Sequence, residues 1–241
     1  MTAAALTAAL DAIADSADAA RLRRFFKTGP GDYGEGDVFI GVRMPAIRAV
    51  VREFRELPLD DVRVALASAV HEHRMAALVI CCEQARRAKK RGDTRAQQAL
   101  FDFYLAHTDR INNWDLVDVT CRDVVGEYLL TIDDARPLKR LARSSVMWER
   151  RIAIVSTWSF IRARQLGPTF EIAELLLDDQ HDLMHKATGW MLREAGKKDE
   201  AALERFLGQF AARMARTTLR YSIERLAPER RRYWLAYGRR S

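Results

Sequence analysis

The chain has 241 residues, enough for one large domain or two small ones, and its apolar content of 49% and charged content of 30% exclude a disordered chain and an ordinary membrane protein. With only 12 glycines and 6 prolines, it has too few turn-forming residues for a sandwich of many short strands, so we expect a mostly helical protein. Its net charge of +7 comes mainly from arginine, whose planar fork suits phosphate.

The N-terminal segment 3–26 lacks the basic stretch that precedes the apolar core of a secretion signal. We expect this segment to form one amphipathic helix instead. The three cysteines, Cys81, Cys82 and Cys121, include no CxxC pair, which argues against a zinc site or a disulfide framework. We therefore expect a cytoplasmic protein with reduced thiols.

Five of the 12 glycines fall between Gly29 and Gly41, where we expect the one long loop of the chain. The segment lacks the lysine and hydroxyl residue of a P-loop, so a nucleotide-phosphate site is disfavoured.

From Pro45 onward, apolar positions recur at spacings of three and four between short polar breaks, which predicts helices. Prolines 45, 58, 137, 168 and 228 lie where helices could start. The helices are predicted at 45–55, 58–69, 71–91, 94–106, 113–125, 133–143, 146–162, 169–178, 182–195, 199–212, 216–225 and 228–237. No alternating run predicts a strand.

Short helices without a sheet must bury their apolar faces on one another. We therefore expect an all-α fold, a HEAT-like α-solenoid with a concave surface, as a single domain over 1–241. No repeat of about 40 residues can be superimposed on itself, so a compact all-α globule also fits the pattern.

Two histidines, His71 and His73, begin the helix over 71–91. Residues two apart on a helix point in different directions, and no third ligand is evident, so we do not expect a metal site here.

In the helix over 113–125, Asn112 or Asn113 can cap the first turn. Trp114 and Asp118 lie about 40° apart on a face beside the buried stripe, so they could present a carboxylate next to an indole. Alternatively, Trp114 anchors the helix, and Asp118, Asp115 and Asp123 are solvated charges.

In the helix over 146–162, Arg151 borders an apolar face. It could form a salt bridge, cover the core with its alkyl stem, or make a fixed phosphate contact. Spacing alone does not decide among these.

In the helix over 182–195, Lys186, Trp190, Arg193 and Lys197 fall within about 60° of one another. Gly189 is expected to leave Trp190 uncovered. An aromatic ring among cations suits a nucleic-acid backbone and its sugars. A tryptophan packed in a helix junction beside ordinary surface lysines is the alternative.

Residues 205–241 hold ten arginines against Glu224 and Glu229, which points either to a polyanionic partner, nucleic acid before membrane, or to a solvated basic surface.

Three segments in this order, WDLVD at 114–118, WERRIAI at 148–154 and KATGWMLRE at 186–194, resemble the signature segments of the AlkD family of DNA alkylation-repair glycosylases. The stretch GEGDVFIGVRMPAIR resembles the family's N-terminal segment, so the resemblance covers about residues 20 to 225. It implies a HEAT-like α-solenoid that grips duplex DNA with a concave basic face and hydrolyses the N-glycosidic bond of cationic N3- and N7-alkylated purines. No metal or organic cofactor is implied, and we expect a monomer.

By motif, the resemblance implies that Asp118 is the catalytic carboxylate. Trp114 and Trp190 would frame the deoxyribose, and Arg151 would contact a phosphate, with its neighbour Arg150 as the alternative. The remaining cations of the 182–195 face, Lys186, Arg193 and Lys197, would bind DNA. It also implies that the base stays in the stack rather than being extruded.

Alkylation gives the purine a positive charge, so it leaves without a general acid. The carboxylate then stabilises the oxocarbenium-like sugar and orients or deprotonates water. A HEAT-like protein that binds DNA of a particular structure without cutting it is the main alternative, and a protein-binding solenoid is the third.

Overall fold

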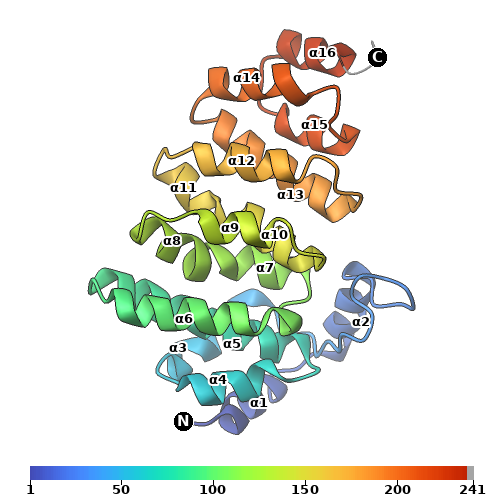
Figure 1. The fold of residues 1–241 in the computed structure, drawn as a ribbon. Coiled ribbons are helices and arrows are strands. Elements are labelled where there is room, and N and C mark those ends of the chain that lie inside the picture. The colour runs from blue at the N-terminus through green and yellow to red at the C-terminus, as the bar shows by residue number, and fades with distance from the viewer. Residues whose placement is uncertain (238–241) are drawn as a thin grey trace. The chain divides into compact units, whose positions relative to one another are not determined.

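The computed structural model describes residues 1–237, and its fold is all-α (Figure 1). In this part of the chain the only extended pairing is an isolated bridge between Val38 and Val70. The chain divides into two compact units, Met1–Thr120 and Cys121–Ser241, called here the N-terminal and C-terminal units. The predicted class, an all-α fold of helical repeats, is confirmed, whereas the single domain stays a prediction. Arg239 and Arg240 of the predicted basic segment lie outside the described residues.

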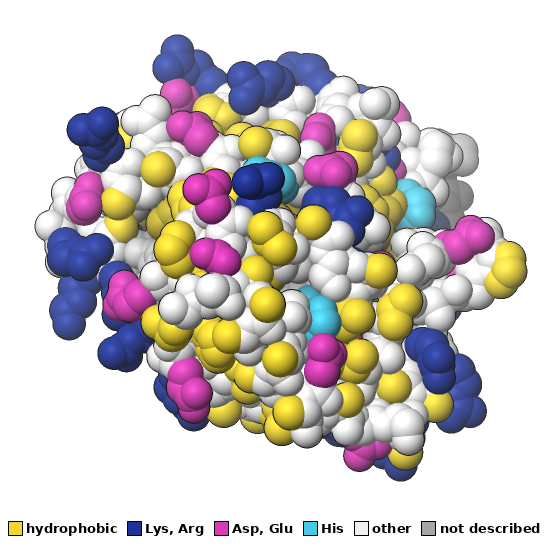
Figure 2. All heavy atoms as spheres, turned by 90° about the horizontal axis from the view of Figure 1, so that it is seen from below, with side chains coloured by type: hydrophobic (Ala, Val, Ile, Leu, Met, Phe, Trp, Pro, Cys, Tyr) yellow, Lys and Arg dark blue, Asp and Glu magenta, His cyan; other side chains and the backbone are white. Residues whose placement is uncertain are grey.

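The N-terminal unit is built around one long buried helix. Its elements are α1 Ala3–Asp11, α2 Ser16–Phe25, α3 Met44–Phe54, α4 Leu59–Leu66, α5 His71–Lys90, α6 Thr94–Ala106, η1 Thr108–Arg110 and α7 Trp114–Cys121. Helix α5 packs against α3, α4 and α6. Its run from Met75 to Cys82 is buried on all sides, because an apolar stretch without a polar face can only form the centre of a core. On the face drawn in Figure 2, acidic and basic side chains are interspersed with hydrophobic ones.

The predicted single helix over 3–26 is wrong, because the chain breaks between α1 and α2. Asp15 has extended backbone dihedral angles, and its carboxylate accepts hydrogen bonds from the backbone N–H groups of Ala17 and Asp18 at 2.8 and 2.9 Å. A side chain that caps the N-terminus of a new helix in this way stabilises the break. In the sequence, Asp15 followed by Ser16 was the signal for a helix start at this position.

The loop that joins α2 to α3 contains the predicted glycine cluster. Gly41 has a φ of +84°, and a Cβ atom there would lie 2.0 Å from the carbonyl oxygen of Asp15. Only glycine tolerates both the left-handed conformation and that close approach. The loop is therefore held against the start of α2.

The C-terminal unit consists of a short π-helical turn followed by helices α8 to α16. Its elements are η2 Arg122–Gly126, α8 Glu127–Thr131, α9 Arg136–Leu141, α10 Met147–Ser156, α11 Trp158–Arg162, α12 Gly167–Leu175, α13 Asp182–Gly196, α14 Glu200–Phe210, α15 Arg216–Ser222 and α16 Pro228–Tyr237. Helix α13 packs against α10, α12, α14 and α15. The predicted prolines lie at or next to the starts of their helices.

Gly189 lies in a close contact between two helices, whereas its neighbour Trp190 is half-buried. A Cβ atom at Gly189 would lie 2.5 Å from the Cβ atom of Tyr221 and 2.6 Å from the carbonyl oxygen of Thr218. The glycine is buried and lets α13 and α15 approach each other closely. Its role is therefore packing within the C-terminal unit.

Two predicted helices are interrupted. The helix expected over 146–162 divides at Thr157, whose hydroxyl donates to the carbonyl oxygen of Ile154 at 2.7 Å and so competes with the regular helical pattern. The helix expected over 113–125 continues into the π-helical turn after Cys121. Such turns occur often at functional sites.

None of the helices in residues 1–237 combines the length and apolar character that crossing a bilayer requires. Cys81, Cys82 and Cys121 are free and buried, and burial raises the pKa of the Cys81 thiol to about 12.

Candidate functional site

A buried network of charged side chains fixes the first turn of α7. The imidazole of His71, which is 2% exposed, lies between two carboxylates: its Nε2 is 2.9 Å from Asp115 Oδ2 and its Nδ1 is 3.1 Å from Asp37 Oδ2. Arg74 donates to the other oxygen of Asp37 at 2.5 Å, and Asn113 donates to Oδ2 at 3.0 Å. The network thus ties the loop, the start of α5 and the start of α7 together.

The charges in this network balance when His71 is protonated. Burial opposes the imidazolium form, but the hydrogen bonds to Asp115 and Asp37 outweigh it and raise the pKa of His71 to about 9. Burial also opposes ionisation of Asp37, yet the hydrogen bond from His71, the charge of Arg74 and the hydrogen bond from Asn113 hold the pKa of Asp37 below its usual value. Two cations and two carboxylates therefore neutralise one another at neutral pH.

The next two residues of α5 hold the loop and α1 in the same way. The carboxylate of Glu72 accepts hydrogen bonds from the backbone N–H groups of residues 40–42, the shortest being 2.8 Å, from Gly41. The two ring nitrogens of His73 lie 3.0 Å from Ser68 Oγ and 3.0 Å from Asp11 Oδ1. The first turn of α5 is therefore the anchor of the glycine-rich loop, a role that the sequence did not indicate.

Trp114, the first residue of α7, is half-buried in an aromatic cluster. Its ring stacks on Phe26, with centroids 5.2 Å apart and planes at 24°, and it meets the edge of the exposed Phe25 at 5.9 Å. Its Nε1–H donates to the hydroxyl of Tyr33 at 3.1 Å. The indole is therefore held in one orientation by the loop and by the end of α2.

Asp118 follows Trp114 by one helical turn on α7 and is half-buried. The predicted stripe of Val117, Cys121 and Val124 is buried, so Asp118 lies beside the core rather than in it. The expected asparagine cap is wrong, because Asn113 donates to Asp37 and Asn112 accepts from Arg74.

Asp115 is not a solvated charge, contrary to the alternative interpretation of this helix. One of its oxygens meets His71, and the other accepts from the backbone N–H of Leu116 at 2.8 Å. Asp115 therefore holds the first turn of α7, and Asp118 lies half-buried one turn further along the same helix.

An apolar hollow of about 410 Å³ lies next to this network in the N-terminal unit. Phe25, Phe26, Phe39 and Met75 contribute to its walls, and Asp115 is among its polar groups. Trp114 and Asp118 do not line it.

In the C-terminal unit, Trp190 of α13 belongs to a row of flat side chains. Its ring centroid is 6.2 Å from that of Trp158, and the guanidinium of Arg122 lies over Trp158 at 5.6 Å. Trp190 and Trp158 are both half-buried, so part of each ring is accessible. A cation over an indole in this arrangement is an attractive contact.

The two neighbouring arginines of α10 have different partners. Arg150 makes a 2.6 Å ion pair with Asp179 and donates to the carbonyl oxygens of Ser144 and Ser145, each at 3.0 Å. Arg151 is 5% exposed and donates to the carbonyl oxygen of Leu183 at 2.6 Å, in the first turn of α13. Arg150 thus holds a turn between helices, whereas Arg151 connects α10 to the helix that carries Trp190.

The three other predicted cations of α13 are each paired with a carboxylate. Lys186 lies 2.6 Å from Asp182, Lys197 contacts Glu194, and Arg193 contacts both Glu194 and Glu224. The predicted core face of Met184, Ala187, Met191 and Ala195 is buried. The cationic face therefore exists, but its charges are partly compensated.

Sequence analysis missed the network around His71. The available signal was the run of polar residues from His71 to Arg74 directly before the apolar run of the same helix, which we considered only as a metal site. In residues 1–237 no three His, Cys, Asp or Glu side chains gather in a way that suits a metal ion.

The family model described as DNA alkylation repair enzyme matches residues 6–226 of the chain. A solved structure described as a predicted DNA alkylation repair enzyme from Enterococcus faecalis superimposes with a TM-score of 0.69 at 16% identity, over 89% of this chain and 97% of that chain. At that identity the likeness shows the fold alone. No curated protein matches the sequence. The family model covers most of the chain and includes all three signature segments, so the chain belongs to the family of DNA alkylation repair enzymes.

Proposed function

We propose that this protein is a DNA glycosylase that hydrolyses the N-glycosidic bond of positively charged N3- and N7-alkylated purines in duplex DNA. The observation that carries the proposal is the placement of Asp118 on α7, one helical turn after Trp114, whose ring is held in one orientation by Phe26 and Tyr33. Asp115, on the same helix, is engaged by the buried network. A carboxylate on a rigid helix beside an indole suits a developing cation.

The reaction places its demand on the sugar. An N3- or N7-alkylated purine already carries a positive charge, so the base departs with the bonding electron pair and becomes neutral without being protonated first. The deoxyribose is left electron-poor at C1′. Water then attacks C1′ and loses a proton, which completes the hydrolysis.

Asp118 would act in both steps, the departure of the base and the attack of water on C1′. Its negative charge stabilises the oxocarbenium-like sugar, and its oxygen orients the water or accepts the water's proton. The faces of Trp114 and Trp190 would attract the electron-poor C–H groups of the sugar, since an aromatic face is electron-rich. The stacking of Trp114 on Phe26 supports this role, because the ring is oriented before DNA binds.

The cations of α10 and α13 would hold the DNA backbone. We propose Arg151 for the phosphate contact, as the resemblance implies, with Arg150 as the alternative. Both are engaged within the protein, Arg150 with Asp179, Ser144 and Ser145 and Arg151 with Leu183. Lys186 would exchange Asp182 for a phosphate oxygen, because an exposed ion pair is weak. Arg193 and Lys197 would bind phosphate while still contacting the buried carboxylate of Glu194. We also propose that the protein is cytoplasmic and that it acts on DNA as a monomer.

The experiment measures free base released from duplex DNA that contains N7-methylguanine, relative to the spontaneous rate. Asp118→Asn keeps the shape of the side chain and removes its charge, so we expect base release to stop while DNA binding is kept or strengthened. Asp102→Asn, an exposed aspartate of α6, is the matched control and should behave as wild type.

Equal loss of binding and release in Asp118→Asn would reject its catalytic role. Salt-sensitive DNA binding without any base release by the wild type would favour the non-catalytic DNA-binding protein instead.

A further inference from the structure

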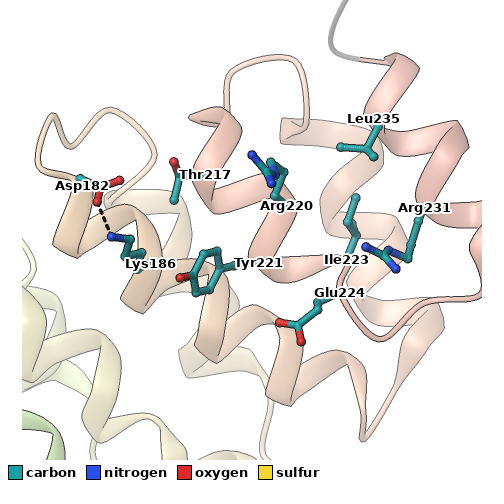
Figure 3. A pocket seen from close by; sticks show the side chains of 9 residues that line it. All are labelled: Asp182, Lys186, Thr217, Arg220, Tyr221, Ile223, Glu224, Arg231 and Leu235. Atoms are coloured by element: carbon teal, nitrogen blue, oxygen red, sulfur yellow. Dashed lines mark ion pairs between the residues drawn. The ribbon is translucent and has the colours of Figure 1, made fainter.

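A hollow of about 610 Å³ lies in the C-terminal unit where α13, α15 and α16 meet. Figure 3 shows Lys186 from α13, Arg220 and Tyr221 from α15, and Arg231 from α16 around it. Ile223 and Leu235 supply apolar surface to the same hollow. A lining that combines cations, a phenol ring and apolar groups suits an organic anion better than a bare ion.

The charges around this hollow do not cancel. Asp182 pairs with Lys186 at 2.6 Å, and that hydrogen bond lowers the pKa of Asp182, which is therefore ionised and engaged (Figure 3). Glu224 pairs with Arg193. Both acids of the lining are thus neutralised by other cations.

Two arginines of the lining, Arg220 and Arg231, are not used in these pairs. Arg220 and Arg231 are exposed, and neither makes a side-chain hydrogen bond or an ion pair with any residue in 1–237. Some exposed arginines elsewhere in this unit have carboxylate partners, as Arg213 has in Asp178 and Arg136 in Asp134, whereas Arg140 lies outside any hollow that contains Arg220 or Arg231. The hollow therefore keeps two guanidinium groups available for an external anion.

A second hollow of about 740 Å³ shares Arg220 and Leu235 with the first and adds Arg216 and Arg232. Arg216 donates to the carbonyl oxygen of Leu235 at 3.1 Å, and Arg232 lies 3.3 Å from Glu229 with both side chains largely exposed. The cations thus continue from one hollow into the next. A continuous row of arginines suits a chain of phosphates rather than a single phosphate.

We propose that the hollow between α13, α15 and α16 binds the phosphodiester backbone of DNA, with Arg220 and Arg231 each donating to a phosphate. The guanidinium fork fits phosphate oxygens with two parallel hydrogen bonds. This contact is separate from Trp190 and Arg151 and does not depend on a lesion. It rests on the proposed function only in taking DNA as the partner.

The test measures binding of an unmodified duplex by fluorescence anisotropy at several salt concentrations. Arg220→Gln with Arg231→Gln in one protein should lower the slope of log affinity against log salt by about 1.8, the share of two phosphates at about 0.9 each. Arg140→Ala, an exposed arginine of α9 without a partner in residues 1–237, is the matched control and should keep the wild-type slope.

A double variant with the wild-type slope would overturn the proposal, provided that its thermal unfolding matches that of the wild type. Arg220→Lys with Arg231→Lys keeps the charges and should retain the slope, which separates loss of charge from loss of structure. Competition with deoxyadenosine monophosphate tests the other source of phosphate. Tight binding of the mononucleotide with no change in the DNA slope would assign the hollow to free nucleotides and reject the DNA contact.

The outcome is independent of the glycosylase assignment. The duplex carries no lesion, and base release is not measured. Even if the wild type released no base, the double arginine variant could still show a salt slope smaller than that of the wild type by the share of two phosphates.

Discussion

The two units of this molecule use their charged residues in opposite ways. Residues 1–120 contain 17 basic and 17 acidic residues, whereas residues 121–241 contain 23 basic and 16 acidic residues, so the C-terminal unit carries the whole net charge of +7. In the N-terminal unit the buried charges at Asp37, His71 and Arg74 form ion pairs within the protein. In the C-terminal unit Arg220 and Arg231 are exposed and have no partner in residues 1–237.

The difference indicates a division of labour. Charges in the N-terminal unit position a loop and the helix that carries Asp118, and we propose that charges in the C-terminal unit attract a polyanion. A buried network specifies a geometry, because a charge that loses its partner inside a protein is costly. Surface cations are exchangeable, because water and salt already weaken their ion pairs.

The largest expected effect comes from removing the centre of the buried network. His71→Ala leaves Asp37 and Asp115 without their shared partner, so we expect the free energy of unfolding to fall by about 3–5 kcal/mol. Denaturant unfolding measures it. His107→Ala removes a half-buried histidine whose ring nitrogen bonds to the carbonyl oxygen of Phe103, one turn away, and it is the control. A loss at His71 no larger than at His107 would contradict the structural role of the network.

The network should also give stability a defined pH dependence. The pKa of His71 rises from an ordinary 6.5 to about 9 on folding, so its contribution is complete below pH 6.5 and is lost as the pH rises through 9. The unfolding free energies of wild type and His71→Gln should therefore converge between these values. A gap that stays constant from pH 6.5 to above 9 would mean that the imidazole is not charged in the folded protein.

The close packing of α13 on α15 offers a smaller effect in the C-terminal unit. Gly189→Ala inserts a methyl group against Tyr221 and Thr218, so we expect a loss of about 1–3 kcal/mol. Gly208→Ala, on α14, meets open space and should be neutral or stabilising by up to about 1 kcal/mol, the difference in helix propensity. Thermal unfolding of the two variants compares them directly, and equal stability would place Gly189 outside the packed interface.

The smallest effect tests whether the paired cations of α13 are exchangeable. Asp182→Asn releases Lys186 from its carboxylate, so we expect duplex DNA to bind up to about fivefold more tightly, which corresponds to an exposed ion pair of at most about 1 kcal/mol. Glu171→Gln releases Lys139 of α9 in the same way and should leave the affinity unchanged. A similar gain in DNA affinity in both variants would mean that the change in net charge, and not the release of Lys186, causes the tighter binding.

Much of the fold could be predicted from the sequence, because helical periodicity and proline positions are local signals. The boundaries of α5, α6 and α13 lie within about a residue of the prediction. Helix boundaries were mispredicted at Asp15 and Thr157, where a side chain forms a hydrogen bond with the backbone and interrupts the helix. The packing role of Gly189 was missed because it depends on close packing against α15, which is distant in the sequence.

The candidate site was less predictable. The resemblance singled out Trp114, Asp118, Arg151 and Trp190 from short motifs, and their roles stay proposals. The pairing of His71 with Asp37 and Asp115 joins residues 34 and 44 positions apart, which no periodicity reveals. The availability of Arg220 and Arg231 likewise depends on which neighbouring arginines find carboxylates, and spacing does not determine that.

The division of labour is tested most directly by the single-turnover rate of N7-methylguanine release at saturating protein, measured over a range of salt concentrations. We predict that Asp118→Asn abolishes release at every salt concentration. The Arg220→Gln, Arg231→Gln protein should release base at the wild-type rate once it is saturating, and should differ only in the protein concentration needed to saturate. A maximal rate that falls in the arginine variant as it does in Asp118→Asn, or one that survives in Asp118→Asn, would contradict the account.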